Sequence, residues 1–104
     1  MITLTVITDS HGDMVVHVAG CSDIKRSHRY DTGARPQTFT GADMAAAITA
    51  VDTDYADMFG LDVYMEDAPE QAWTVSHMKE APCFTKARAA AGITFGALGR
   101  PVAK

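Results

Sequence analysis

The chain has 104 residues, of which 47% are hydrophobic and 21% are charged, and its formal net charge at pH 7 is −4. These values are typical of one folded domain and exclude a disordered chain, and no apolar run approaches the ~18 residues of a membrane span. The N-terminus lacks the basic and apolar regions of a secretory signal. We therefore expect a cytoplasmic protein without membrane contact, whose two cysteines are reduced.

The charges are unevenly distributed along the chain. Residues 36–78 contain eight acidic residues and no lysine or arginine, whereas residues 79–104 contain five basic residues and one acidic residue. The acidic middle disfavours nucleic-acid binding, because such binding depends on the neutralisation of phosphate charges. It fits either a basic protein partner or a solvated acidic face.

Residues 2–8 and 14–19 predict two β-strands. The first is rich in β-branched residues, and a polar loop containing glycine separates the two. We expect them to pair as an antiparallel hairpin. In the second strand, His17 lies on the face opposite Val16 and Val18, because successive side chains of a strand alternate between faces.

Two short elements are predicted next. Ser22 is a favourable residue for capping a helix, and Asp23 suits the positive end of the helix dipole, so we expect a short helix over residues 23–29. Residues 37–40 predict a third strand, with Phe39 as its apolar anchor.

The strongest helix pattern covers residues 41–59. Apolar residues recur along it at helical spacing: Met44, Ala45, Ala47, Ile48 and Val51. We expect the face formed by Met44, Ile48 and Val51 to pack on the sheet. Farther along, residues 72–78 predict a strand, and residues 85–91 predict a weak helix.

The sequence therefore predicts an α+β fold. A small, mainly antiparallel sheet, made of the N-terminal hairpin and one or two later strands, packs against the central amphipathic helix. We assign residues 1–91 to a single domain and residues 92–104 to a C-terminal tail that is either packed or mobile.

Two cysteines and two histidines suggest a metal site. His17 precedes Cys21, and His77 precedes Cys83, so the four side chains would give zinc a Cys₂His₂ ligand set. Their spacing differs from that of zinc knuckles, in which cysteines lie about two to four residues apart. The alternative is that the cysteines are small buried hydrophobic residues and the histidines make ordinary hydrogen bonds.

Cys21 is also a candidate reactive thiol. It lies at the start of a predicted helix and near Lys25 and Arg26, and both features favour the thiolate. His17 would be its base, and Asp23 would orient the base. No phosphate loop, dinucleotide fingerprint or nucleophile elbow is present, so we expect a non-enzymatic protein.

The acidic end of the central helix is the predicted partner-binding surface. Aromatic residues, which are enriched in interface cores, accompany the acidic residues there. The patch consists of Asp52, Asp54, Tyr55, Asp57, Phe59 and Tyr64. The aspartates do not form a calcium-binding loop of the EF-hand type, because Asp57 occupies the place of the required glycine.

The segment from His17 to Arg26, with the pattern His-x-Ala-Gly-Cys-x-Asp-Ile-x-Arg, and the later Pro82-Cys83 pair resemble a group of small proteins encoded by bacteriophages of actinobacteria. The resemblance implies an accessory protein that binds a host protein in the bacterial cytoplasm. It also implies that Cys21 and Cys83 are neighbours in space. It implies no catalytic role, and His77 is not part of the pattern.

Overall fold

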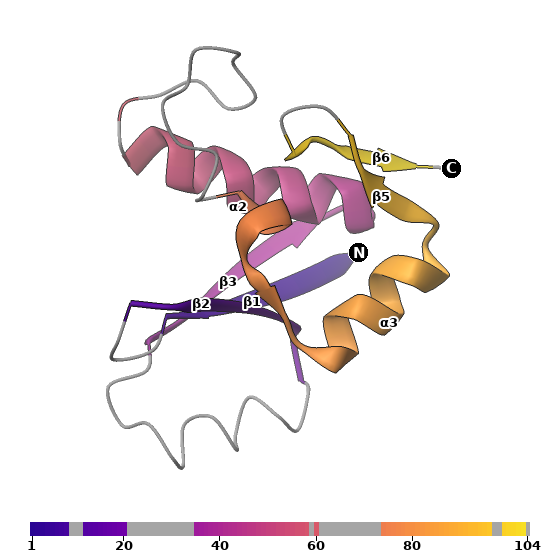
Figure 1. The fold of residues 1–104 in the computed structure, drawn as a ribbon, viewed down its shortest axis with the longest axis horizontal. Helices are drawn as coiled ribbons and strands as arrows, with labels where there is room; N and C mark the ends of the chain where they lie inside the picture. Colours follow the sequence, from indigo (N-terminus) through magenta and orange to yellow (C-terminus); the bar gives the residue numbers. More distant parts are fainter. Residues whose placement is uncertain (9–11, 21–34, 59, 61–73, 97–98, 104) are drawn as a thin grey trace.

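The computed structural model describes residues 1–8, 12–20, 35–58, 60, 74–96 and 99–103. In chain order, the elements are β1 (Ile2–Thr8), β2 (Met14–Val18), β3 (Arg35–Gly41), α2 (Met44–Met58), the 3₁₀ turn η2 (Val75–His77), β4 (Lys79–Glu80), α3 (Pro82–Ala90), β5 (Ile93–Phe95) and β6 (Pro101–Ala103). Figure 1 shows that α2 lies along one face of the sheet and that the β5–β6 hairpin lies beyond it. The predicted α+β fold is confirmed.

The main sheet has four strands in the order β3-β1-β2-β4. The strand β1 is antiparallel to both of its neighbours, with Leu4 opposite Val18 on one side and opposite Phe39 on the other. The short strand β4 pairs with β2 in parallel. The sheet is therefore mainly antiparallel, and it contains the predicted N-terminal hairpin.

The core lies between this sheet and α2. Leu4 and Val6 of β1 are fully buried and form one cluster with Ala47, Ile48 and Val51 of α2. These positions alternate in the strand and recur every three or four residues in the helix, so each element presents one apolar face to the other. The predicted packing face of the helix is confirmed.

The start of α2 is fixed by a side-chain cap. The Oδ1 atom of Asp43 accepts a hydrogen bond from the backbone N–H of Ala46 at 2.8 Å, and its carbonyl accepts one from Ala47 at 3.0 Å. Asp43 thereby satisfies donors that the first helical turn leaves without partners. No helix in the described part of the chain is long and apolar enough to cross a membrane.

The strand pair β1–β2 is buried on both faces. Thr5 and Ile7 point to the side opposite Leu4 and Val6, and both are almost fully buried. Thr5 lies opposite His17 of β2, which is only 3% exposed. His17 therefore lies on an inner strand of the sheet, and its side chain is buried.

The predicted strand at residues 72–78 is wrong within its described part. Val75–His77 form the turn η2, and the strand at this edge is β4, which begins after it. The physical reason is that the backbone N–H groups of this segment bind other acceptors. Oδ1 of Asp52 accepts a hydrogen bond from the N–H of Val75 at 2.7 Å, and the carbonyl of Thr74 accepts one from the N–H of His77 at 2.9 Å. Such bonds compete with a strand ladder.

The helix α3 begins three residues earlier than the predicted helix at residues 85–91. Pro82 occupies its first turn, directly after Ala81. Proline suits this place because a first-turn residue needs no backbone N–H and because its fixed φ is helical. Cys83 therefore lies in the first turn of α3.

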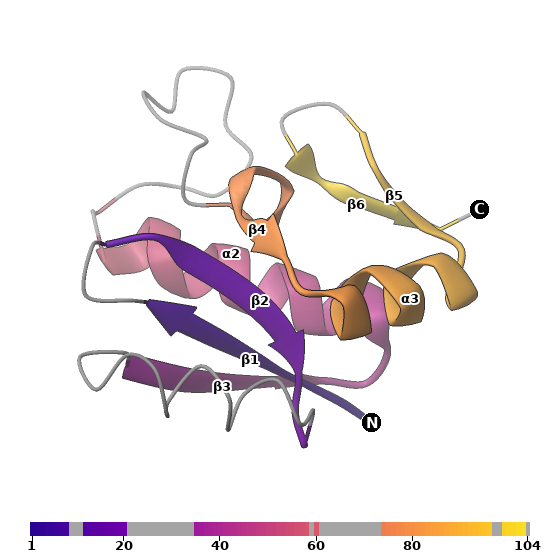
Figure 2. The same ribbon diagram turned by 60° about the horizontal axis from the view of Figure 1, so that its bottom comes forward.

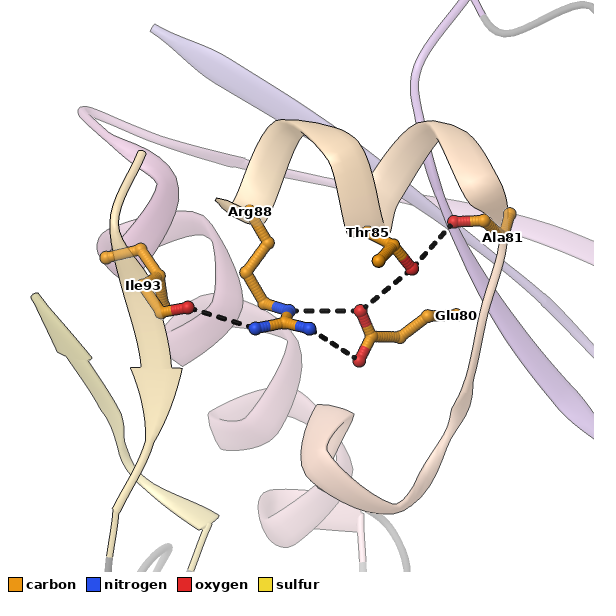
Figure 3. Close-up of polar contacts among 5 residues, drawn as sticks. All are labelled: Glu80, Ala81, Thr85, Arg88 and Ile93. Atoms are coloured by element: carbon orange, nitrogen blue, oxygen red, sulfur yellow. Dashed lines mark hydrogen bonds and ion pairs between the residues drawn. The ribbon is translucent and has the colours of Figure 1, made fainter. Parts of the chain in front are cut away.

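Arg88 connects α3 to the two elements beside it. Its guanidinium donates hydrogen bonds to both carboxylate oxygens of Glu80, at 3.0 and 3.3 Å, and to the carbonyl of Ile93 at 3.0 Å. Thr85 also donates to Glu80, at 3.2 Å (Figure 3). The guanidinium lies 5.3 Å from the ring centre of Phe95. This set of contacts holds α3 between β4 and the β5–β6 hairpin.

Candidate functional site

Of the four predicted zinc ligands, His17 and Cys83 lie together. The Sγ atom of Cys83 is 3.8 Å from Nδ1 of His17, and it accepts a hydrogen bond from the backbone N–H of Val18 at 3.4 Å. The backbone N–H of Ala81 donates to the carbonyl of Val16 at 3.0 Å. That bond attaches the start of α3 to the edge of β2 and brings the thiol to the imidazole.

The other two predicted ligands are placed differently. His77 is exposed in η2, and its Nδ1 lies 3.2 Å from the hydroxyl oxygens of Thr74 and Ser76. Cys21 lies outside the described residues, as does the predicted contact between the two cysteines. Among the residues that the structure describes, no group of three histidine, cysteine, aspartate or glutamate side chains is arranged to hold a metal ion.

The contact between His17 and Cys83 is compatible with zinc as well as with a hydrogen bond. A nitrogen and a sulfur bound to one tetrahedral zinc at ordinary bond lengths are roughly 3.6 Å apart, and the observed separation is 3.8 Å. A zinc site here would need ligands from outside the described residues, and Cys21 is the predicted one.

Metal analysis of the purified protein tests the zinc prediction. A zinc-stabilised domain is expected to contain about one zinc ion per chain and to melt at a lower temperature after chelation, because metal binding contributes directly to folding free energy. Protein that lacks zinc and melts at the same temperature with and without a chelator would contradict the prediction.

An open apolar groove of about 480 Å³ lies beside Cys83. One wall is the end of β2, and the other is a single face of α3; Figure 2 shows these two segments side by side. The described residues that line the groove are Val18, Ala19, Gly20, Cys83, Lys86, Ala87 and Ala90. The thiol is thus half-buried on the side of His17 and accessible from the groove.

The geometry brings the imidazole of His17 to Cys83. The sequence predicted His17 as a base for Cys21, and the described structure places its imidazole against Cys83. A helix start, a backbone N–H donor and an adjacent imidazole all favour a nucleophilic thiolate. The signal in the sequence was Pro82: a proline that starts a helix puts the next residue in the first turn.

The predicted acidic patch is only partly on the surface. Asp52 is 1% exposed and Tyr55 is 6% exposed, so both lie inside the molecule instead of on an exposed face. They continue the buried stripe of α2, because they follow Ile48 and Val51 at helical spacing. Among the other members, Asp54 and Asp57 are exposed. Phe59 and Tyr64 lie outside the described residues.

Replacing Asp52 with alanine is expected to lower the free energy of unfolding by about 1–3 kcal/mol. The reason is that the buried N–H of Val75 would lose the carboxylate that accepts its hydrogen bond. Urea unfolding followed by circular dichroism measures the loss. The matched control is Asp54→Ala, which changes an exposed aspartate two residues later in α2. Equal losses of stability in the two variants would show that Asp52 has no special structural role.

The Tyr55 phenol should make the protein sensitive to alkali. Burial raises the pKa of Tyr55 above its ordinary value of 10.0; a hydrogen bond with Thr8 lowers it, and the Asp54 carboxylate raises it. Because the pKa of Tyr55 is higher in the folded protein than in the unfolded chain, the neutral phenol stabilises the fold at pH values below the pKa of the unfolded chain. This contribution is lost as the pH rises through the pKa of the folded protein.

The test compares the urea midpoints of the wild type and Tyr55→Phe from about pH 7 to about pH 11. At neutral pH the variant should be less stable by about 1 kcal/mol, because the hydroxyl donates a hydrogen bond to Gln37. Above the ordinary tyrosine pKa the difference should shrink, because only the wild type loses the contribution of a neutral Tyr55. Parallel pH profiles would contradict the assignment.

Comparisons of the chain with models of protein families, with curated proteins and with solved structures give no match.

Proposed function

We propose that the protein is a small thiol-reactive domain whose working side chain is Cys83. The observation that supports this most strongly is the 3.8 Å contact between Sγ of Cys83 and Nδ1 of His17 at the wall of an open groove. A thiol reacts as its thiolate, and an adjacent imidazole takes up the proton that must leave the sulfur.

The surroundings of the pair support the same function. His17 is almost completely buried, whereas Cys83 is half-buried and lines the groove. The base is therefore shielded from solvent, while a reagent in the groove reaches the sulfur. The N–H of Val18 points at the sulfur as well and stabilises negative charge on it.

Alkylation by iodoacetamide, a small uncharged reagent, tests the proposal. In the Cys21→Ser background only Cys83 reacts, and its rate is compared with and without a further His17→Asn substitution. We expect the histidine change to slow alkylation at least about tenfold, because it removes the base. The matched control is His77→Asn, which removes an exposed histidine that lies in η2. Equal rates in the His17→Asn variant and its parent would overturn the proposal.

A second candidate function is binding of a basic segment of a protein partner at the end of α2. Asp54 and Asp57 are exposed there, and the last turn of α2 contains no basic residue. Acidic groups at this end face the negative end of the helix dipole, so a basic partner would relieve an unfavourable interaction. Met58, which is 60% exposed, adds apolar contact area. The partner implied by the sequence resemblance is a host protein of a phage-infected bacterium.

A pull-down from host lysate tests this second function when it is run with variants. Proteins retained by the wild type at low salt should be lost at high salt, because exposed charges are screened. They should also be lost with Asp54→Asn and with Asp57→Asn but kept with Asp13→Asn, since Asp13 is exposed in the loop before β2. Retention of the same proteins by all three variants at both salt concentrations would exclude the α2 surface.

A further inference from the structure

We infer that the groove beside Cys83 receives a small disulfide that carries a carboxylate, and that Cys83 forms a mixed disulfide with it. The inference rests on the thiol reactivity proposed above and adds the class of substrate. Four observations support it: the position of the thiol, the charge of the groove, the size of its wall residues and the position of the base.

Lys86 gives the groove its charge. It is the charged residue among the described residues that line the groove, and it lies one helical turn after Cys83 on the same face of α3. Within the described part of the chain, the carboxylate of Glu80 is bound by Arg88, and Lys86 forms no ion pair. As a residue that lines the groove, Lys86 can bind a carboxylate that enters with the disulfide.

The wall residues leave room for such a molecule. Ala19 and Gly20 on one side, and Ala87 and Ala90 on the other, have the smallest side chains, and together with the thiol they border a space of about 480 Å³. Sites for small molecules in proteins measure roughly 300–1,000 Å³. The apolar walls suit the methylene and sulfur atoms of a disulfide, and Lys86 suits its acidic end.

The reaction is a thiol–disulfide exchange. The proton of the Cys83 thiol moves to Nδ1 of His17, and the thiolate attacks one sulfur of the bound disulfide. A new S–S bond forms at Cys83 while the S–S bond of the ligand breaks. The departing thiolate takes the proton from His17 and leaves as a thiol. Cys83 is oxidised, the departing half is reduced, and no further oxidant is required.

The experiment uses two disulfides of opposite charge on the full chain in the Cys21→Ser background. Oxidised glutathione carries carboxylates, and cystamine carries only amines. Mass spectrometry measures the rate at which one thiol half is added to Cys83. We expect the ratio of the glutathione rate to the cystamine rate to be higher for Cys83 than for the cysteine of an unstructured reference peptide.

Charge reversal at Lys86 tests whether this lysine recognises the carboxylate of the disulfide. We expect Lys86→Glu to lower the ratio of the glutathione rate to the cystamine rate by about fivefold or more. The matched control is Lys79→Glu, an exposed lysine on β4 that does not line the groove, and it should leave the ratio unchanged. Because Lys86 and Lys79 are both exposed, neither change should prevent folding.

The outcomes separate this inference from the proposal on which it rests. Fast, His17-dependent alkylation by uncharged iodoacetamide, together with a glutathione-to-cystamine ratio that Lys86→Glu does not alter, would overturn the substrate class and leave the reactive thiol standing. Slow alkylation that does not depend on His17 would overturn both.

Discussion

Replacing Phe84 with alanine is expected to lower the free energy of unfolding by about 3–5 kcal/mol. The Phe84 side chain is fully buried in the core cluster, whereas Ala87, which also packs against the core from α3, is only partly buried. Alanine would leave a cavity that surrounding side chains fill only in part. Domains of this kind have total stabilities of about 5–15 kcal/mol, so a loss of this size shifts the urea midpoint strongly.

The Phe84→Ala variant also tests the position of Cys83. Phe84 is the neighbour of Cys83 in the first turn of α3, and its ring anchors that turn to the core. A control is Phe95→Ala on β5, whose ring is only partly buried and should cost less. An unchanged urea midpoint in Phe84→Ala would mean that α3 does not pack as described, and the position of the thiol would then be in error.

Replacing Gly41 with alanine is expected to cost about 3 kcal/mol. Gly41 is the last residue of β3 and lies against the first turn of α2. A Cβ atom on Gly41 would collide with the backbone N of Ala47 and lie 2.7 Å from the Cα of Ala47. These are backbone atoms, which a side-chain rotation cannot move away. The helix would have to shift from β3, and the packing of Ile48 and Val51 on the sheet would suffer.

Gly60→Ala is the matched control for Gly41→Ala. Among the residues that the structure describes, an added Cβ at Gly60 meets nothing within 4 Å, but Gly60 has a φ of +69°. Only backbone strain is therefore introduced, which costs about 1–2 kcal/mol. Thermal or urea unfolding of the two variants measures the difference. A smaller loss for Gly41→Ala than for Gly60→Ala would contradict the close approach of α2 to the end of β3.

The sheet and its helix were predictable because their signals are local. Alternation of apolar residues around Leu4 and Val6, and helical spacing around Ile48 and Val51, are properties of short segments. The turn η2 was not predictable, because the acceptor for Val75 is a carboxylate 23 residues earlier in the chain. A buried aspartate such as Asp52 is rare, and a hydropathy pattern places it on the surface.

The candidate site was predictable only in part. His17 and Cys83 stood in the predicted ligand set, and the structure brings these two together. Their contact depends on β4, which pairs with β2 over two residues only. Such a short parallel pairing has no recognisable sequence pattern. The groove depends in turn on where α3 meets the end of β2, which is a tertiary contact that no local signal specifies.

The most direct measurement of the central claim is the alkylation rate of Cys83 in the folded protein relative to the same cysteine in urea, at one pH and in the Cys21→Ser background. Unfolding removes His17 and the helix start from the sulfur and leaves an ordinary thiol. We predict that the folded protein reacts at least about tenfold faster, even though its sulfur is half-buried. A folded protein that reacts at the same rate as the unfolded chain, or more slowly, would contradict the account.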